Sequence, residues 1–504
     1  MYSILKLITG TLCSRILGFL RDIIFFAILG SSLEASAFLI AFAIPNLFRR
    51  LCGEGALNSV FIPVFAQRYI QKPHTALHFL NIFFTRFGIY LGISILCAMY
   101  ILAILHYYID SHKWATVLFL TNAMLPYLWF ICTAALLNGA LNVLNAFSLT
   151  AFSPIFLNLS MLGGLWLGSF SAIPIKQVSI LAVCVIIGGW LQWFLPKIQL
   201  KRKGFPIHYS TWENDPDISR IWQLFLPSVL GAAVFQINAM LGRFFAYTID
   251  EHAVSALYLA NRFLELPLGL FAFAIISTLL PKLSLYSAQK NDIGAQQLLK
   301  NGISLLLLLL LPAAVGLYFL AEPMMDLCFC WGRFSFKDTQ NIVPLLKIFS
   351  IGLPIFGLSS LLTRVFYAQK NTQTPVKIAS LTLINYALCA YILTPYCGVQ
   401  SLAAASVIST LGQFILQYKI IQKKYPTYGL TFKTFCGKFW IGLIFFAVSL
   451  GCSTQYFCWT HQKVQDAFTL TTCVILFFFI YLTLLFCLDK KSFKQLIKLN
   501  IENV

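Results

Sequence analysis

Charged side chains interrupt two neighbouring apolar stretches near the start of the chain, at residues 12–30 and 34–67. They are Arg15, Arg21, Asp22, Arg49, Arg50 and Glu54. An ionisable group at membrane depth costs a few kcal/mol or more, so it normally faces a protein interior or a water-filled cavity. Four arginines in two adjacent stretches therefore indicate a cationic cavity, which suits an anionic cargo.

The first stretch places several polar residues on one side of a helix. Arg15 and Asp22 are seven residues apart and lie on nearly the same face, with Ser14 on that general side. Arg21 lies about 100° round the helix from Asp22. One arginine paired with Asp22 could merely fix helix packing, but this alternative does not account for four arginines in the two stretches.

The second stretch contains helix-breaking residues beside its charges. Pro45 removes a backbone hydrogen bond and is followed by Asn46 and by two glycines, so we expect a kink or an unwound turn. Freed backbone groups are tolerated at membrane depth where they line a cavity. Arg50 and Glu54 are four apart and can pair, which leaves Arg49 as the freer cation. Alternatively, both arginines lie near the cytoplasmic interface and extend to lipid phosphates.

A similar set of polar residues recurs later, in the segment YLANRFLELPLG. It contains Asn261, Arg262, Glu265 and Pro267. Arg262 and Glu265 are three residues apart, so a structural ion pair is the alternative to a binding role. Arginine binds phosphate well because its planar guanidinium forms two parallel hydrogen bonds and stays charged. We therefore expect a site for a phosphate or diphosphate, lined by Arg15, Arg21, Arg49 and Arg262.

Other polar residues give weaker signals. The chain has no phosphate-binding loop motif, no Ser–His–Asp set and no histidine or cysteine spacing typical of a metal site, so we predict no metal and no cofactor. If the chain were instead a membrane enzyme, Asp326 and Asp338 would be its candidate catalytic carboxylates. A disulfide between Cys452 and Cys458 is an alternative that requires both cysteines to face an oxidising compartment. Several asparagines are expected only to hydrogen-bond neighbouring helices: Asn138, Asn142, Asn145 and Asn158.

The elements that must position these residues are membrane-spanning helices. The 504 residues are 59% hydrophobic and only 11% charged, whereas soluble domains carry roughly 25% charged residues. Apolar runs of about 20 residues require helices, because lipid cannot hydrogen-bond loose backbone groups. We expect fourteen spans, at about 2–30, 34–69, 80–106, 115–145, 149–170, 176–197, 219–246, 252–286, 299–321, 340–369, 376–395, 399–422, 435–455 and 468–488.

The distribution of positive charge predicts the orientation. The formal net charge is +19, but lysine and arginine lie mainly in short connections, which argues against nucleic-acid binding. These connections follow even-numbered spans, so both termini are expected in the cytoplasm of a bacterial cell, with the chain in the cytoplasmic (inner) membrane. We read the first apolar run as a span and not as a cleavable signal.

Two pairs of prolines suggest an internal repeat. Pro63 and Pro281 lie 218 residues apart, and Pro154 and Pro375 lie 221 apart. Because each half would hold six spans, both enter the membrane from the same side, as a parallel repeat. The expected parts are an N-terminal lobe (1–197), a basic linker (198–218), a C-terminal lobe (219–424) and a two-helix appendix with a basic tail (425–504).

Five segments resemble the MurJ (MviN) family of lipid II flippases, in the MOP exporter superfamily. They are SRILGFLRD, AFAIPNLFRRLCGEGALNSVFIPVFAQ, AFSPIFLNLSMLG, YLANRFLELPLG and KNTQTPVKIA. The likeness runs in order from about residue 10 to residue 430. It implies two six-helix lobes around a central cavity and two further helices that form a lipid-accessible groove. It also implies alternating access, which carries an undecaprenyl-diphosphate-linked disaccharide-pentapeptide to the outer leaflet.

The resemblance assigns roles to individual positions. The family's cavity cations match Arg15, Arg21, Arg49 and Arg262, and other functional positions match Ser14, Asp22, Asn46, Glu54 and Pro154. The chain departs from the family at three positions, where an acidic residue, a lysine and an aspartate are common. These positions hold Ser36, Ala43 and Asn261. The charge balance of the cavity therefore differs from that of the family.

We therefore predict a flippase, not an enzyme, whose partners are lipid II, membrane lipid and other proteins of cell-wall synthesis. Either the membrane potential or a coupled ion would drive it. Four alternatives remain: a flippase for another polyprenyl-diphosphate-linked oligosaccharide, a drug exporter, an enzyme acting on polyprenyl diphosphates, and a non-transporting scaffold. A drug exporter for cations should have an acidic cavity, whereas a scaffold should tolerate substitution of the intramembrane arginines.

Overall fold

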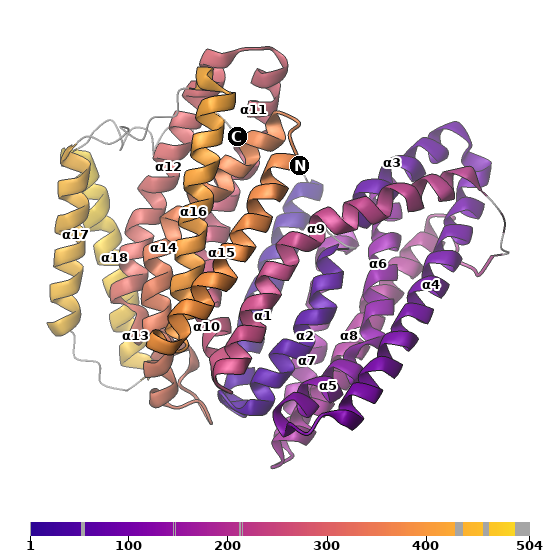
Figure 1. The fold of residues 1–504 in the computed structure, drawn as a ribbon, viewed down its shortest axis with the longest axis horizontal. Helices are drawn as coiled ribbons and strands as arrows, with labels where there is room; N and C mark the ends of the chain where they lie inside the picture. Colours follow the sequence, from indigo (N-terminus) through magenta and orange to yellow (C-terminus); the bar gives the residue numbers. More distant parts are fainter. Residues whose placement is uncertain are drawn as a thin grey trace. The chain divides into compact units, whose positions relative to one another are not determined.

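The computed structural model describes residues 2–51, 56–144, 146, 148–210, 213, 215–428, 437–456 and 463–488. Within these ranges every regular element is a helix (Figure 1). Eight helices there are long and apolar enough to cross a membrane by length and composition. Each of the fourteen expected spans coincides with one helix or with successive helical segments, so the prediction of an all-helical membrane protein with about fourteen spans is confirmed.

Chain contacts divide the protein into two compact units, which are described separately. The first comprises Met1–Tyr247 and Trp331–Phe334, and the second comprises Thr248–Cys330 and Ser335–Val504. The four parts expected from the sequence remain predictions. The helices up to the end of the first long segment are α1 (Tyr2–Leu29), α2 (Leu33–Arg49), α3 (Ala56–Gln71), α4 (Pro73–Tyr108), α5 (His112–Met124), α6 (Pro126–Val143), α7 (Ser148–Ser169), α8 (Pro174–Arg202) and α9 (Pro216–Ile249).

The helices that follow begin with an interrupted span. Its three parts are α10 (Ala253–Pro267), a π-helical turn (Leu268–Ala272) and α11 (Phe273–Ala288). The remaining helices are α12 (Asp292–Phe319), α13 (Ala321–Phe329), α14 (Phe336–Ala368), α15 (Gln373–Cys397), α16 (Gln400–Lys424), a 3-10 turn (Pro426–Tyr428), α17 (Gly437–Tyr456) and α18 (Lys463–Leu488).

Proline and polar caps set several helix starts. Proline occupies the first turn of α4, α6 and α8, where its missing N–H would have no helical partner. Pro126 also divides the fourth span into α5 and α6, a break that the hydropathy pattern did not predict. Ser335 and Asp338 form a reciprocal capping box at the start of α14. Asp338, one of the two candidate carboxylates of an enzyme, thus has a structural role.

The kink or unwound turn expected in the second span falls partly outside the described residues and stays a prediction. Pro45 lies inside α2, which ends at Arg49, and α3 begins at Ala56. The residues between them include 52–55, which lie outside the described ranges. A different span is interrupted after Pro267, where the π-helical turn separates α10 from α11. Turns of this type frequently occur at functional sites, and this one lies close to Arg262.

Small residues allow close helix packing in the first unit. A Cβ atom added at Gly164 of α7 would lie 2.8 Å from Cβ of Cys184 on α8. One added at Gly188 of α8 would lie 3.0 Å from Cα of Leu157 on α7. Helices in membranes associate through such contacts, because apolar side chains gain little by leaving lipid. The α7–α8 pair therefore has a tight seam that larger residues would force apart.

The basic connection before α9 is bound to the α3–α4 hairpin of the first unit. Arg68 donates from Nη1 to Asp217 (2.8 Å) and from Nη2 to Asp215 (2.9 Å). Asn81 of α4 donates to the carbonyl of Pro206 and accepts from the N–H of His208. These contacts fix the beginning of α9, since the Asp215 carbonyl accepts N–H bonds from its first turn.

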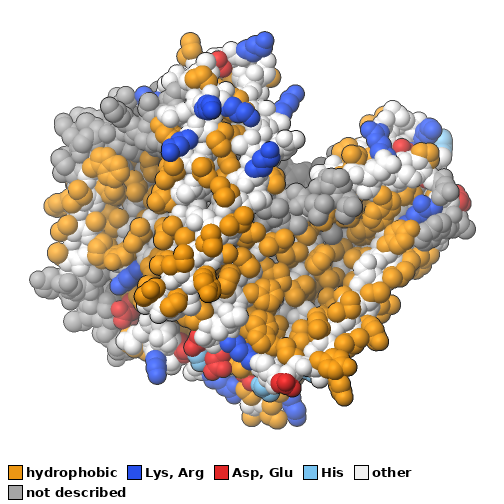
Figure 2. Space-filling view, in the orientation of Figure 1, with side chains coloured by type: hydrophobic (Ala, Val, Ile, Leu, Met, Phe, Trp, Pro, Cys, Tyr) orange, Lys and Arg blue, Asp and Glu red, His pale blue; other side chains and the backbone are white. Residues whose placement is uncertain are grey.

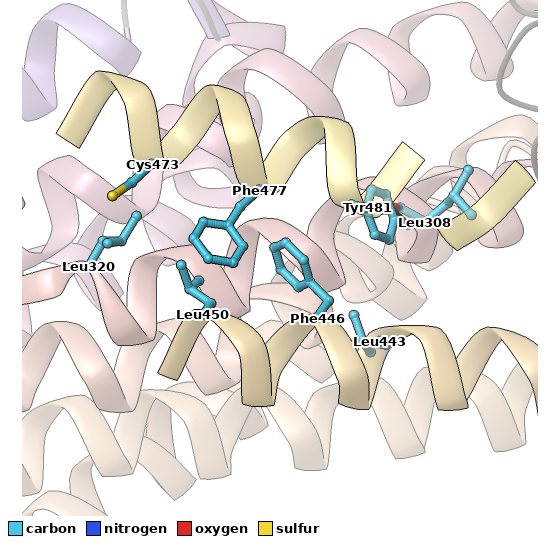
Figure 3. Packing of buried hydrophobic residues seen from close by; sticks show 8 residues of the cluster. All are labelled: Leu308, Leu320, Leu443, Phe446, Leu450, Cys473, Phe477 and Tyr481. Carbon is cyan, nitrogen blue, oxygen red and sulfur yellow. Dashed lines mark hydrogen bonds between the residues drawn. The ribbon is translucent and has the colours of Figure 1, made fainter. Parts of the chain in front are cut away.

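In the second unit, the two C-terminal helices pack on α12. Figure 3 shows Phe446 and Leu450 of α17 beside Phe477 of α18. The buried hydroxyl of Tyr481 on α18 donates to the carbonyl of Leu308 on α12 (2.6 Å). This contact satisfies the only polar atom of that aromatic side chain, so it anchors α18 without a buried unpaired group.

The lipid-exposed character of the second unit is visible along α15 and α16. Figure 2 shows hydrophobic side chains over the middle of this face, with Lys and Arg side chains gathered toward one end. The exposed apolar side chains of α15 are large, and they are Leu381, Ile384, Leu388, Tyr391 and Ile392. A wide apolar band with cations at its edge is typical of a helix pair that faces a bilayer.

Candidate anion-binding site

Arg21 lies in a hydrogen-bond network between α1 and α7. Its Nη2 atom is 2.6 Å from Oδ1 of Asp22, and its Nη1 atom donates to Oδ1 of Asn158 (3.2 Å). Asn158 in turn donates from Nδ2 to the carbonyl of Ser14 (3.2 Å). Asp22 is only 3% exposed and Asn158 is 7% exposed. Arg21 is therefore oriented by one carboxylate and one amide before any ligand binds.

The ion pair considered as a packing alternative is thus made by Arg21, not by Arg15. Arg15 is exposed, as are Leu12 and Ile16, which lie on the same side of α1. An exposed guanidinium in an apolar stripe is available to a ligand, whereas the charge of Arg21 is balanced by Asp22. The two arginines of α1 therefore differ: Arg21 is paired with a buried carboxylate, whereas Arg15 is exposed.

The last turn of α2 carries a second oriented arginine. Arg49 donates from Nε to Oδ1 of Asn46, at 2.9 Å, and both side chains are half-buried. This bond orients the guanidinium from within its own helix. Arg50 is exposed. Glu54 lies outside the described residues, so the expected Arg50–Glu54 pair remains a prediction.

Arg262 belongs to the second unit, on α10. Its Nη1 atom lies 3.6 Å from Oε2 of Glu265, which is the structural pair proposed as the alternative to a binding role. Glu265 is well exposed, so the pair is screened and weak. Asn261 donates to the carbonyl of Leu257 in its own helix (2.9 Å). The Asn261 side chain is therefore hydrogen-bonded to the backbone of its own helix.

The remaining predicted positions lie in different surroundings. Ser36 and Ala43, where the family often has charged residues, are buried in α2. Pro154 is an exposed residue inside α7, four residues before Asn158. The structure thus brings together Ser14, Arg21, Asp22 and Asn158 in one network, and Asn46 with Arg49 in another. Arg262 pairs with Glu265 in the second unit.

Asp326 and the nearby thiols form a separate polar group in the second unit. Lys463 of α18 lies 3.3 Å from Oδ2 of Asp326 and donates to its carbonyl (2.7 Å). Burial raises the pKa of the Cys328 thiol to about 11. Burial, and then the hydrogen bond to Asp326, raises the pKa of Cys330. Such thiols are poor nucleophiles at neutral pH, because the thiolate is the reactive form.

Two further features bear on the metal and disulfide predictions. Among the described residues, no group of three His, Cys, Asp or Glu side chains is arranged to hold a metal ion. Cys452 is an exposed free thiol, whereas Cys458 lies outside the described residues. The disulfide between these two cysteines therefore remains untested.

Three residues with defined positions in the first unit were not predicted as functional. Asn158 was expected only to join helices, but it also holds Arg21. Arg68 and Tyr127 gave no signal in the sequence. Asp215, which binds Arg68, lies 147 residues away, and Tyr127 lies beside Phe42, far earlier in the chain. A proline–tyrosine pair at a helix start is the only local feature that marks Tyr127.

Comparisons with known proteins agree on one family. The family model described as "Lipid II flippase MurJ" matches residues 25–485. A probable lipid II flippase MurJ of Bdellovibrio bacteriovorus is 32% identical over 431 residues, which cover 83% of this chain and 81% of that protein. One of Haemophilus influenzae is 29% identical over 469 residues, with 89% and 90% covered.

Solved structures give the same fold. A lipid II flippase MurJ in an inward closed conformation matches with a TM-score of 0.78 at 23% identity, covering 95% of this chain and 97% of that one. An inward-facing multidrug resistance MATE family transporter of the MOP superfamily matches with a TM-score of 0.66 at 15% identity, covering 82% and 95%. At these identities the two structures establish the fold alone.

Proposed function

Since this chain belongs to the MurJ family of lipid II flippases, we propose that it carries lipid II across the bacterial cytoplasmic membrane. The cargo is the undecaprenyl-diphosphate-linked disaccharide-pentapeptide, which moves from the cytoplasmic to the outer leaflet. The family match over residues 25–485 is the observation that carries this proposal. No bond is made or broken in this movement, so the protein acts as a transporter.

The diphosphate is the part of the cargo that the arginines recognise. Arg49 is aligned by Asn46, and Arg15 is exposed in an apolar stripe of α1. Each can form two parallel charge-assisted hydrogen bonds with phosphate oxygens. Arg21 keeps its orientation through Asp22 and Asn158, so it contributes a fixed donor with a partly balanced charge. Arg262 supplies the corresponding cation of the second unit.

Transport proceeds by alternating access in this proposal. The sugar–peptide head group occupies a hydrated cavity while the polyprenyl chain stays in the bilayer, so the polar head never meets hydrocarbon. Rocking of the two lobes would expose the site first to one side and then to the other. Pro45 and Pro267 favour such movement, because each removes a hydrogen bond from the helical ladder near a candidate arginine.

In this proposal the membrane potential drives the outward movement of the cargo. Moving one charge through 100 mV is worth about 2.3 kcal/mol. The interior of the cell is negative, so outward movement of an anionic diphosphate is favoured. A coupled ion would act on the same step. No resident cofactor enters the proposal, and proteins that make or use lipid II are its natural partners.

The orientation follows from the basic ends of the helices. Exposed cations end α8 and α16, and these include Lys201, Arg202, Lys423 and Lys424. Placing these ends in the cytoplasm puts both termini there as well. Lipid II synthesised at the cytoplasmic face would then enter from the side where these cations lie.

The leaflet location of lipid II in cells depleted of this protein tests the proposal. Wild-type protein should restore outward movement, whereas Arg49→Ala should leave lipid II in the cytoplasmic leaflet. Arg202→Ala, at the exposed end of α8, is the matched control and should behave like wild type. Normal export in depleted cells would refute the proposal. Restored export of a different polyprenyl-diphosphate oligosaccharide, with lipid II unaffected, would instead identify that lipid as the cargo.

A further inference from the structure

Tyr127, on α6, packs against two neighbouring helices of the first unit, α2 and α8. It lies in the first turn of α6 and is fully buried. Its ring centroid is 6.4 Å from that of Phe42 on α2. A Cβ atom added at Gly189 of α8 would lie 2.4 Å from the ring, so only glycine leaves room for the ring there. The position of the phenol is therefore set by its neighbours.

The hydroxyl of this tyrosine differs from those of two other buried tyrosines, Tyr247 and Tyr481. It is buried and has no hydrogen-bond partner in the described part of the chain. By contrast, Tyr247 donates to the carbonyl of Lys113, and Tyr481 donates to that of Leu308. An unpaired buried donor costs roughly 1–3 kcal/mol, so its presence requires an explanation.

The side of α2 that meets Tyr127 also carries the anion-binding residues. Phe42, Asn46 and Arg49 are spaced four and then three residues apart, which places them on one face of the helix. Phe42 packs against the Tyr127 ring, and Arg49 lies two turns further along the same face of α2. The Tyr127 ring thus lies against the face of α2 that also carries Arg49.

We propose that the Tyr127 hydroxyl is a further donor for the diphosphate bound at Arg49, completing a subsite with the Arg49 guanidinium. This inference rests on the proposed function, because it assigns an additional residue to the same ligand. The hydroxyl is buried in this structure, so the helices around it must shift for it to meet a phosphate oxygen. Pro45 removes a backbone hydrogen bond from α2 close to Phe42, which lowers the cost of a shift of that helix.

Binding of undecaprenyl diphosphate to the purified full-length protein tests the inference. Tyr127→Phe removes one oxygen atom and leaves the ring, so it should fold normally, with a melting temperature equal to or above that of wild type. Its affinity should fall about tenfold, the effect of one lost hydrogen bond to a charged group. Wild-type affinity in this variant would overturn the inference.

Two glycine variants provide an independent check, because Tyr127 keeps its hydroxyl group in both. Gly189→Ala should displace the Tyr127 ring and weaken binding in the same direction. Gly163→Ala, at a helical position with open space beside it, should bind like wild type. Equal affinities of these two variants would contradict the inference. Tyr481→Phe controls for loss of a buried tyrosine hydroxyl and should alter stability but not affinity.

Arg49→Ala separates this inference from the function on which it rests. If Arg49→Ala weakens binding while Tyr127→Phe does not, the Tyr127 subsite is wrong and the arginine site stands. If Arg49→Ala binds undecaprenyl diphosphate as wild type does, the proposed diphosphate site is itself wrong. Weaker binding in both variants, with undiminished stability, is the expected result.

Discussion

Arginines of similar appearance in the sequence occupy different electrostatic environments in the structure. Arg21 is paired with a buried carboxylate and held by an amide, whereas Arg15 is exposed. Arg49 is oriented by Asn46 on the same helix. Preorganised donors of this kind favour binding, because less side-chain entropy is lost when a ligand arrives. The Arg21 network is therefore a structural feature that also bears on the proposed diphosphate binding.

Removal of Asp22 should destabilise the protein through Arg21. Asp22→Ala leaves a guanidinium that is only 12% exposed without its carboxylate, which we expect to cost about 3 kcal/mol. Arg21→Ala combined with Asp22→Ala should cost less than the sum of the single changes, because neither charge is then left unpaired. Reversible unfolding in detergent measures both. Additive effects would show that the two side chains do not interact.

The Cys328 thiol should react slowly with alkylating reagents until the pH is high. Its pKa of about 11 in the folded protein lies above the ordinary value of 9.0. The neutral thiol therefore stabilises the fold below about pH 9, and this contribution is lost as the pH rises through about 11. Peptide mapping after brief treatment with a maleimide at pH 8 should find Cys328 mostly unlabelled in folded protein and labelled after unfolding. Rapid labelling at pH 8 would contradict the assignment.

At the scale of elements, apolar runs and prolines predicted most of the helices. Each expected span is found because lipid-facing sequence has few alternatives to a helix. The division of the fourth span at Pro126 was not predicted, since proline at a helix start and proline inside a helix look alike in a short window. The π-helical turn after Pro267 depends on packing around it, which a sequence does not display.

The connection before α9 illustrates a different limit. Its charges suggested a solvated basic linker, but Asp215 and Asp217 bind Arg68 across about 150 residues of chain. Such pairings depend on which helix ends meet in the folded protein. Residues with partners one turn away, such as Asn46 and Arg49, could be anticipated from spacing alone. Asn158 and Tyr127 could not.

Loss of Arg68 should loosen the start of α9. Arg68→Ala removes bonds to both aspartates and to Thr75, and we expect a cost of roughly 3 kcal/mol, because Arg68 and Asp215 are largely buried and Asp215 loses its charged partner. Hydrogen exchange of the amides in residues 215–222 should quicken, while exchange in α14 stays unchanged. Arg202→Ala serves as the control. Unchanged exchange in Arg68→Ala would show that aromatic packing alone holds this segment.

At the scale of the whole molecule, composition predicted the class of protein, whereas the orientation inferred from the charge distribution stays a prediction. A chain that is 59% hydrophobic with 11% charged residues has to bury most of its surface in lipid or in helix contacts. The family match then supports a lipid cargo. The proposed cationic site was inferred from the sequence because arginine at membrane depth is costly, whereas the hydrogen-bond partners of these arginines are seen only in the fold.

Protein-dependent movement of lipid II in liposomes tests the central claim most directly. Purified protein is reconstituted with lipid II, and the fraction that reaches the outer leaflet is followed with an inside-negative potential. Wild-type protein and Arg202→Ala should accelerate outward movement, whereas Arg49→Ala should fall to the rate of protein-free liposomes. Movement by Arg49→Ala at the wild-type rate, or no effect of the wild-type protein, would contradict the account.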